Sequence, residues 1–174
     1  MNEKIFFDFL EHRRSIRAFK EDAIDESKID KILQACNLAP SSGGLQTFEI
    51  YQIKNIEMKE KIVSAAKDQT FISQAPLLLV FCANPSLSIE RYGERSHLFS
   101  VQDATIAAAY AQLTVYALGL STVWVGAFDE NKVTKILELP QGQRPVVILP
   151  IGYDNEKPKE KTTRGPMSLL HILE

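Results

Sequence analysis

Residues 101–118 of the chain have the sequence VQDATIAAAYAQLTVYAL, and Gly119 follows them directly. The apolar side chains of this stretch cover almost the whole circumference of a helix instead of forming one stripe. Gly119 is a residue type that commonly ends a helix. Because a helix that is apolar all round must be buried on more than one side, we expect residues 101–118 to form the central helix of the fold.

Weaker patterns on both sides of this helix predict further helices and strands. Helical periodicity and capping residues predict helices at residues 4–12, from Asp25 or Glu26 to Pro40, at 58–66, and at 132–137 after an Asp129 cap. Alternating or continuous apolar runs predict strands at residues 48–53, 77–83, 122–125 and 146–151. The polar stretch at 84–98 is expected to be a loop or a short helical cover, and its length suggests a function. This irregular order of elements predicts an α+β fold.

The overall composition is that of an ordinary globular protein. The chain has 174 residues, of which 45% are hydrophobic and 24% are charged, so we expect a single domain over residues 1–174. The net charge of −2 gives no basic field that would favour nucleic acid. The apolar run at residues 104–125 is rich in alanine and interrupted by polar residues, which indicates a buried helix and strand rather than a membrane span. The charged residues within 1–10 do not fit a signal peptide, so a cytoplasmic location is expected.

Metal sites and the common nucleotide-binding turns are not expected. Cys36 and Cys82 stand in apolar surroundings and are predicted to be buried, reduced thiols. His12, His97 and His171 lie too far apart to show the spacing of metal ligands. The sequence has neither GxGxxG after a strand nor GxxxxGK[ST], so a nicotinamide nucleotide would not be held on a Rossmann turn.

The first group of candidate binding residues is RRSIR at residues 13–17. If the backbone is extended here, Arg13, Ser15 and Arg17 point to the same side. Two guanidinium groups and a hydroxyl would suit an anion that has several oxygens. The alternative is that Arg13 and Arg14 only complement the C-terminal end of the preceding helix.

Three more segments contain small or polar residues where a ligand could approach the backbone. At residues 39–46, APSSGGLQ joins a helix to a strand, and Gln46 offers both a donor and an acceptor. At residues 119–128, GLSTVWVGAF leaves a buried strand at Gly126 and Ala127, whose backbone amides could face a ligand. A polar stretch after Gly152 carries the cations Lys161 and Arg164. The alternatives are a plain turn, a core strand followed by a turn, and a solvated tail, respectively.

The order of these segments resembles the nitroreductase family of FMN flavoproteins. The resemblance rests on RRSIRAF at 13–19, APSSG at 39–43, ALGLST at 117–122 and ILPIGY at 148–153. It therefore extends over nearly the whole chain. The family often has Asn at the position of Gly44 and Pro at the position of Thr47, and the segment between Pro85 and Leu98 is compact for the family.

The resemblance implies an α+β fold with a central mixed β-sheet flanked by helices, and an intertwined homodimer with two FMN sites at the subunit interface. It also implies the following flavin-binding residues. Those at the phosphate, the ribityl chain and the pyrimidine end are Arg13, Ser15 and Arg17, with help from Arg14. Those that line the flavin from the partner subunit are Ser41 and Ser42, with Gln46 nearby. Those along the isoalloxazine, with a backbone N–H near N5, are Val125, Gly126 and Ala127. Those that reach the phosphate from the C-terminal stretch are Lys161 and Arg164.

The function implied by the resemblance is an FMN-dependent oxidoreductase that moves electrons from NAD(P)H through FMN to a small organic acceptor such as a nitroaromatic, a quinone or a flavin. FMN carries this chemistry, so no catalytic side chain is expected. One alternative is a specialised flavoenzyme of the same family, such as a dehalogenase, a flavin-processing enzyme or an enoyl-type reductase. Others are a non-catalytic FMN-binding or sensor protein and an interaction module with a degenerate site.

Overall fold

One four-stranded sheet forms the centre of the protein in a computed structural model that describes residues 2–157 and 160. The strand order is β1-β2-β4-β3, and each neighbouring pair is antiparallel. The strands are β1 (Phe48–Ile53), β2 (Leu77–Ala83), β3 (Ser121–Thr122) and β4 (Arg144–Gly152). The predicted mixed sheet is therefore wrong for these four strands, because the parallel contact among the described residues is an isolated bridge between Ser15 and Thr122.

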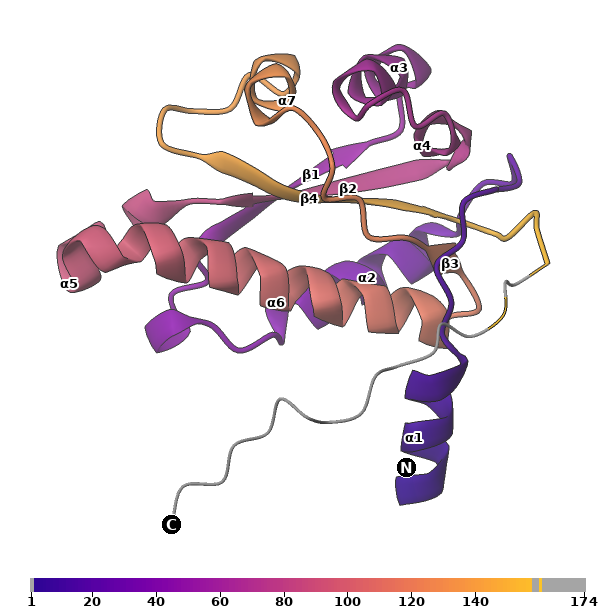
Figure 1. Cartoon of the computed structure of the whole chain (residues 1–174). Coiled ribbons are helices and arrows are strands. Elements are labelled where there is room, and N and C mark those ends of the chain that lie inside the picture. Colours follow the sequence, from indigo (N-terminus) through magenta and orange to yellow (C-terminus); the bar gives the residue numbers. More distant parts are fainter. Residues whose placement is uncertain (1, 158–159, 161–174) are drawn as a thin grey trace.

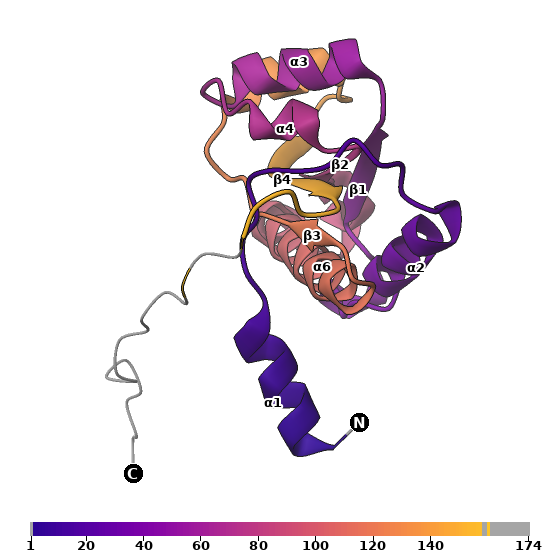
Figure 2. The ribbon, with the colours of Figure 1, turned by 90° about the vertical axis from the view of Figure 1, so that its right-hand side faces the viewer.

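Two layers of helices cover the two faces of this sheet (Figure 1). The helices α2 (Glu26–Asn37) and α6 (Ser96–Ala117) lie on one face. The helices α3 (Ile56–Ala65), α4 (Phe71–Gln74) and α7 (Glu130–Ile136) lie on the other, as the turned view in Figure 2 also shows. The predicted α+β class is confirmed, and α4 is a short helix that the sequence patterns did not predict.

Strand β2 shows why this arrangement needs a continuous apolar run. Its residues Leu77, Leu79 and Phe81 belong to the core beneath α2 and α6. The alternate residues, Leu78, Val80 and Cys82, belong to the core beneath α3, α4 and α7. Because successive side chains of a strand point to opposite faces, a strand that is covered on both faces must be apolar at every position. The strand predicted at residues 77–83 is confirmed.

Helix α6 confirms the central helix predicted at residues 101–118, although it starts earlier, at Ser96, and ends at Ala117. Its small buried side chains face the sheet and α2, where they allow close packing. They are Ala104, Ala107, Ala108 and Ala111. The opposite side of α6 stays open in the single chain, where Leu98 is 54% and Tyr110 40% exposed. One chain therefore buries only part of the apolar circumference of this helix.

The predicted cover at residues 84–98 consists of short helical turns before α6. They are the 3-10 helices η2 (Pro85–Leu87) and η3 (Gly93–Arg95), with α5 (Ile89–Tyr92) between them. Helix α7 has the predicted cap, because the Asp129 side chain accepts a hydrogen bond from the Lys132 N–H at 3.0 Å. The strand predicted at 122–125 is shorter, since β3 ends at Thr122 and Val125 forms only an isolated bridge with Ile148.

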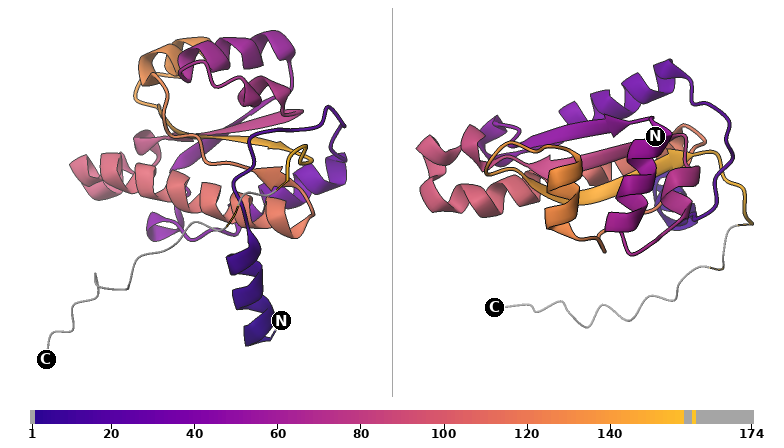
Figure 3. Two further views of the ribbon diagram at one scale, coloured as in Figure 1. Left: turned by 45° about the vertical axis from the view of Figure 1, so that its right-hand side comes forward. Right: turned by 90° about the horizontal axis from the view of Figure 1, so that it is seen from above.

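Helix α1 (Glu3–His12) projects away from the two layers (Figures 1 and 3). Its N-cap Asn2 accepts a hydrogen bond from the Ile5 N–H at 2.9 Å. None of its residues is buried, and four large apolar side chains on it are exposed. These side chains are Ile5, Phe6, Phe7 and Leu10. A helix of this length is marginal in water without packing of its apolar face, so α1 needs a further surface.

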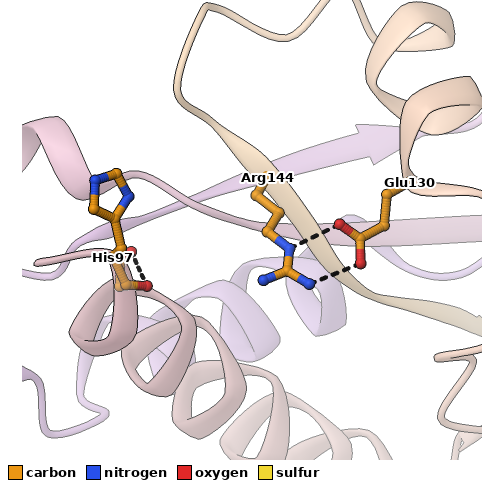
Figure 4. Close-up of polar contacts among 4 residues, drawn as sticks. His97, Glu130 and Arg144 are labelled. Carbon is orange, nitrogen blue, oxygen red and sulfur yellow. Dashed lines mark hydrogen bonds and ion pairs between the residues drawn. The ribbon is translucent and has the colours of Figure 1, made fainter. Parts of the chain in front are cut away.

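An ion pair joins the start of α7 to the start of β4 (Figure 4). Arg144 donates two hydrogen bonds to the Glu130 carboxylate, at 2.7 and 2.8 Å. These hydrogen bonds hold the pKa of Glu130 below its ordinary value. Both side chains are about half exposed, so the pair contributes at most about 1 kcal/mol to the free energy of unfolding.

No helix within residues 2–157 has the length and apolar character needed to cross a lipid bilayer. In the same part of the chain, His, Cys, Asp and Glu side chains nowhere form a group of three or more that could hold a metal ion.

The thiols of Cys36 and Cys82 test whether the cores on the two faces of the sheet are closed to solvent. Burial raises the pKa of Cys36 and of Cys82 to about 12 in each case, so both thiols stay protonated at about pH 8. We expect neither thiol to react with a disulfide reagent in the native protein and both to react after denaturation, as measured by the released chromophore. Rapid modification of a native thiol would show that one of the two cores is open.

Candidate functional site

The segment at residues 13–17, here called the N-terminal arm, runs extended beside β3. Ser15 forms a parallel bridge with Thr122, and the Ile16 N–H donates to the Thr122 carbonyl at 3.2 Å. Ile16 is buried, whereas Arg17 is exposed. Since side chains alternate along an extended backbone, Ser15 and Arg17 face away from the core. The arm thereby lies next to the segment that follows β3.

The two arginines at the start of the arm have other surroundings. The Arg14 guanidinium folds back onto the end of α1, where it donates to the carbonyls of Glu11 and Arg13 at 2.6 and 3.0 Å. This contact matches the alternative interpretation for Arg14, a cation that complements a helix end. Arg13 and Arg14 line a cavity of about 200 Å³ together with Tyr116, and Ser15 and Arg17 do not line it. In one chain, Arg13, Ser15 and Arg17 therefore do not surround a single cavity.

Backbone N–H groups are available where the chain leaves β3. The N–H and the carbonyl of Val125 both pair with Ile148 at 3.0 Å, so the Val125 amide is not free for a ligand. Gly126 and Ala127 are exposed, and their N–H groups find no acceptor within the described residues. A side chain at Gly126 would touch only the indole of Trp124, at 3.6 Å. These two amides can therefore face a flat ligand.

Trp124 is a further candidate site residue, which the sequence patterns did not indicate. It is 37% exposed and lies against the backbone of Gly126. The available signal was that it is the single tryptophan of the chain and stands among small residues at a strand end. An exposed indole provides a large flat surface for stacking.

The loop at residues 41–46, here called the serine loop, has an unusual backbone. Gly43, Gly44 and Gln46 all have positive φ angles, at 61°, 73° and 49°. The Ser41 hydroxyl accepts a hydrogen bond from the Gln46 N–H at 3.0 Å. The Gln46 side-chain NH₂ donates to the carbonyl and the side-chain oxygen of Asn37, both at 2.9 Å. The prediction that Gln46 offers a donor and an acceptor is therefore wrong, because only its Oε1 atom remains for a ligand.

Asp103 holds the serine loop from inside the protein. Its side chain on α6 is 1% exposed. One carboxylate oxygen accepts the N–H and the hydroxyl of Ser42, both at 2.9 Å. The other accepts the Thr47 hydroxyl at 2.7 Å and its N–H at 3.3 Å. The sequence analysis missed this residue, and its one signal was a carboxylate inside an otherwise apolar helix.

The short helix α5 packs on the outside of the serine loop. A β-carbon added to Gly43 would overlap the Tyr92 hydroxyl and would lie 2.9 Å from the Arg91 guanidinium. The Tyr92 ring in turn packs edge-on against Phe99 of α6, with ring centroids 5.1 Å apart. The cover at residues 85–95 is therefore in direct contact with the loop.

The serine loop and the N-terminal arm lie near opposite ends of α6. Ser41 and Ser42 line a cavity of about 560 Å³ together with Asp103 and Ile106. The arm lies near Tyr116, thirteen positions further along the helix, which corresponds to about 20 Å. Lys161 and Arg164 lie outside the described residues. One chain thus brings residues 13–17 beside Thr122 of β3 and leaves residues 41–46 near the other end of α6.

These features define an α+β domain that carries candidate binding segments near the two ends of α6. The nitroreductase family model matches residues 10–153. The chain is 33% identical over 175 residues to an FMN reductase of Bacillus subtilis described as using NAD(P)H, which covers 92% of this chain and 70% of the relative. The solved structure of NfrA2 from B. megaterium superposes with a TM-score of 0.89 at 31% identity, covering 100% of this chain and 75% of the other.

A second solved structure has almost the same length as this chain. It is an FMN-dependent nitroreductase from Clostridium difficile, with a TM-score of 0.82 and 29% identity, and the match covers 97% of this chain and 99% of the other. The chain belongs to the nitroreductase family.

The contact between α5 and the serine loop can be tested by adding one methyl group. Gly43→Ala places a side chain at a positive φ and against Tyr92, so we expect the free energy of unfolding to fall by about 1–2 kcal/mol or more. Gly44→Ala is the matched control, because Gly44 also has a positive φ but has open space around it. Denaturant unfolding should show the larger loss for Gly43→Ala, and Tyr92→Phe should reduce the difference. Equal losses in the two variants would contradict the contact.

Proposed function

We propose that this protein is an FMN-dependent oxidoreductase that uses NAD(P)H to reduce a small organic acceptor such as a nitroaromatic, a quinone or a flavin. The observation that carries the proposal is the pair of N–H groups at Gly126 and Ala127, which find no acceptor within the described residues and follow the exposed Trp124. Hydrogen-bond donors beside a flat aromatic surface suit the edge of a flavin ring. The family membership and the names of the relatives point the same way.

The residues of the site fit the parts of FMN. Cations at Arg13 and Arg17 suit the phosphate and the electron-rich pyrimidine end, and Ser15 suits the ribityl chain. Arg14 supports the arm through its contacts with the end of α1. Lys161 and Arg164 are proposed as further phosphate contacts. Ser41, Ser42 and the Oε1 atom of Gln46 offer hydrogen-bonding groups from the serine loop.

We further propose that two copies of the chain form an intertwined homodimer and that the serine loop of one copy completes the site of the other. The loop and the arm adjoin positions about 20 Å apart along α6, and this spacing supports the arrangement because one chain places the two segments near opposite ends of that helix. The unburied α1 and the open side of α6 supply apolar surface for such an interface. A closed two-fold dimer would use the same surfaces on both copies.

FMN, when bound, would supply the redox chemistry by accepting a hydride from NAD(P)H and passing electrons to the acceptor. The protein supplies binding, orientation and charge. A guanidinium at Arg17 near the pyrimidine end would stabilise negative charge on the reduced ring. The N–H groups of Gly126 and Ala127 would orient the ring edge near N5. No side chain is assigned a role as acid, base or nucleophile.

The decisive experiment is to purify the protein and to measure its flavin spectrum with and without reductant. We expect a yellow protein whose absorbance is bleached by NADH or NADPH under anaerobic conditions and recovers when a nitroaromatic or a quinone is added. Bound FMN that resists both donors would favour the non-catalytic or sensor alternative. A colourless protein that ignores added FMN would refute the proposal.

Arg17→Ala tests whether the Arg17 guanidinium binds the pyrimidine end of FMN. Loss of a charge-assisted hydrogen bond should weaken FMN binding by roughly tenfold or more, and the flavin potential should become more negative. Quenching of the fluorescence of the single tryptophan, Trp124, measures the affinity. Arg144→Ala is the matched control, because it removes the same side chain at the far end of the sheet. Unchanged affinity and potential in Arg17→Ala would exclude Arg17 as a flavin contact.

Phe7→Glu tests whether α1 is buried between two copies. Phe7 is 59% exposed in the single chain, and a charge there should break an apolar interface. We expect a shift from dimer to monomer in analytical ultracentrifugation, together with loss of FMN. Ile56→Glu is the control, since Ile56 is 53% exposed at the start of α3 on the other layer. A Phe7→Glu protein that stays dimeric would contradict the role of α1.

A further inference from the structure

Residues 126–128, here called the N–H span, are fixed at both ends by backbone hydrogen bonds. Before the span, the N–H and the carbonyl of Val125 pair with Ile148 of β4 at 3.0 Å. After the span, the Asp129 N–H donates to the carbonyl of Ala65 at the end of α3, at 2.8 Å. The residues between these points are exposed or half-buried and belong to no helix or strand. The span therefore connects β4 to α3, and its own conformation depends on other contacts.

Within the described residues, one hydrogen bond reaches the N–H span. The side-chain NH₂ group of Gln69 donates to the Ala127 carbonyl at 3.2 Å and to the Ala66 carbonyl at 2.8 Å, so both of its protons are used. Both partners are carbonyl oxygens, which only accept, and this fixes which end of the Gln69 amide faces them. The Gln69 side chain thereby joins the end of α3 to the span, across 58 positions of sequence.

The turn that places Gln69 has a backbone conformation that its residues rarely adopt. Lys67 and Asp68 have positive φ angles of 55° and 56°. Two consecutive residues in the left-handed region are unfavourable when neither is glycine. The turn also ends α3, because the Asp68 N–H donates to the Val63 carbonyl at 3.1 Å. Ending a helix does not require a side chain that reaches Ala127, so the Gln69 contact is a feature beyond the helix cap.

The Gln69 bond restricts one particular N–H group of the span. Each peptide unit is planar, so a fixed carbonyl also fixes the N–H of the next residue. The Val125 carbonyl, held by Ile148, fixes the Gly126 N–H in this way. The Ala127 N–H belongs to the next peptide unit, which makes no hydrogen bond within residues 2–157 and lies between the unit held by β4 and the unit held by Gln69. Since glycine has the freest backbone of all residues, the Gln69 bond is what limits rotation of the Ala127 N–H.

We propose that Gln69 is a positioning residue that orients the Ala127 N–H toward the flavin edge near N5 by holding the Ala127 carbonyl. The inference rests on the proposed function, because it takes the flavin as the ligand of this N–H. Gln69 acts through the backbone, and its side chain is assigned no contact with the flavin. The N5 atom accepts a hydrogen bond in the oxidised ring and carries a proton of its own in the reduced ring. An oriented N–H therefore stabilises the oxidised form more than the reduced form.

Gln69→Met tests this role, because methionine keeps the length of the side chain and lacks the NH₂ group. We expect oxidised FMN to bind roughly fivefold more weakly and reduced FMN to bind as it does to the wild type. This difference raises the flavin potential by about 20 mV, since a tenfold ratio corresponds to about 30 mV for a two-electron couple. The sign is opposite to that expected for Arg17→Ala. Gln74→Met, at an exposed position of α4, is the matched control and should leave the potential unchanged.

A double-mutant cycle tests whether Gln69 acts through Ala127. Ala127→Gly frees the same backbone and should also raise the potential, and the double variant should shift it by clearly less than the sum of the two single shifts. Direct contact between Gln69 and the flavin would make the shifts additive, and that result overturns the positioning role. Backbone nitrogen relaxation measured by NMR gives a readout without redox chemistry. The Ala127 amide should become more mobile in Gln69→Met and should stay rigid in Gln74→Met.

The failure of this inference differs from the failure of the proposed function. A protein that binds no flavin refutes the proposed function and this inference with it. If FMN binds, a Gln69→Met potential that equals the wild-type value or becomes more negative refutes this inference alone. A lower unfolding midpoint with an unchanged potential would show that Gln69 only ends α3. If Gln69→Met does not fold, Ala127→Gly decides, because an unchanged potential in that variant shows that the orientation of this N–H has no effect.

Discussion

The close packing of α6 against β2 and β4 determines how the serine loop and the N-terminal arm are spaced. Alanines at the contact, such as Ala104 and Ala108, let the helix approach the sheet closely. On the opposite face, the layer of α3, α4 and α7 packs against β2 and β4. The serine loop and the N-terminal arm then adjoin positions about 20 Å apart along α6. The same helix keeps an open apolar side, and α1 has no buried residue although its Phe9 ring lies against Tyr116.

The Asp103 carboxylate is the polar exception inside this packing. A buried charge is unfavourable unless hydrogen bonds compensate for its lost hydration, and Asp103 receives four of them from Ser42 and Thr47. Thr47 supplies both an N–H and a hydroxyl to this network, which a proline at that position could not do. The loop can therefore keep its positive φ angles at Gly43, Gly44 and Gln46 without rigid residues of its own.

Several predictions for the candidate site are corrected by the hydrogen bonds that individual groups make within the chain. Gln46 lies in the loop, but its NH₂ group is used by Asn37. Val125 lies beside Gly126, but its N–H pairs with Ile148, and the Arg14 guanidinium turns back to the end of α1. In each case the competing partner is a backbone or side-chain group of this chain whose direction no residue pattern records. No residue pattern indicated Asp103, because its hydrogen-bond partners are distant in sequence. None indicated Trp124 either, because its exposure depends on how the chain turns after β3.

The sequence alone was sufficient for the α+β class, the strands β1 and β2, the Asp129 cap and the position of the central helix, because periodicity and capping are local properties of the chain. Its ordered motifs were also sufficient for the nitroreductase family, which the family match confirms. The tertiary structure alone decided that the sheet strands run antiparallel, which groups of the candidate segments already have hydrogen-bond partners, and that these segments lie near opposite ends of α6. The physical reason is that hydrogen bonds are directional and their donors and acceptors can be used up by distant residues, so their availability depends on the folded chain as a whole.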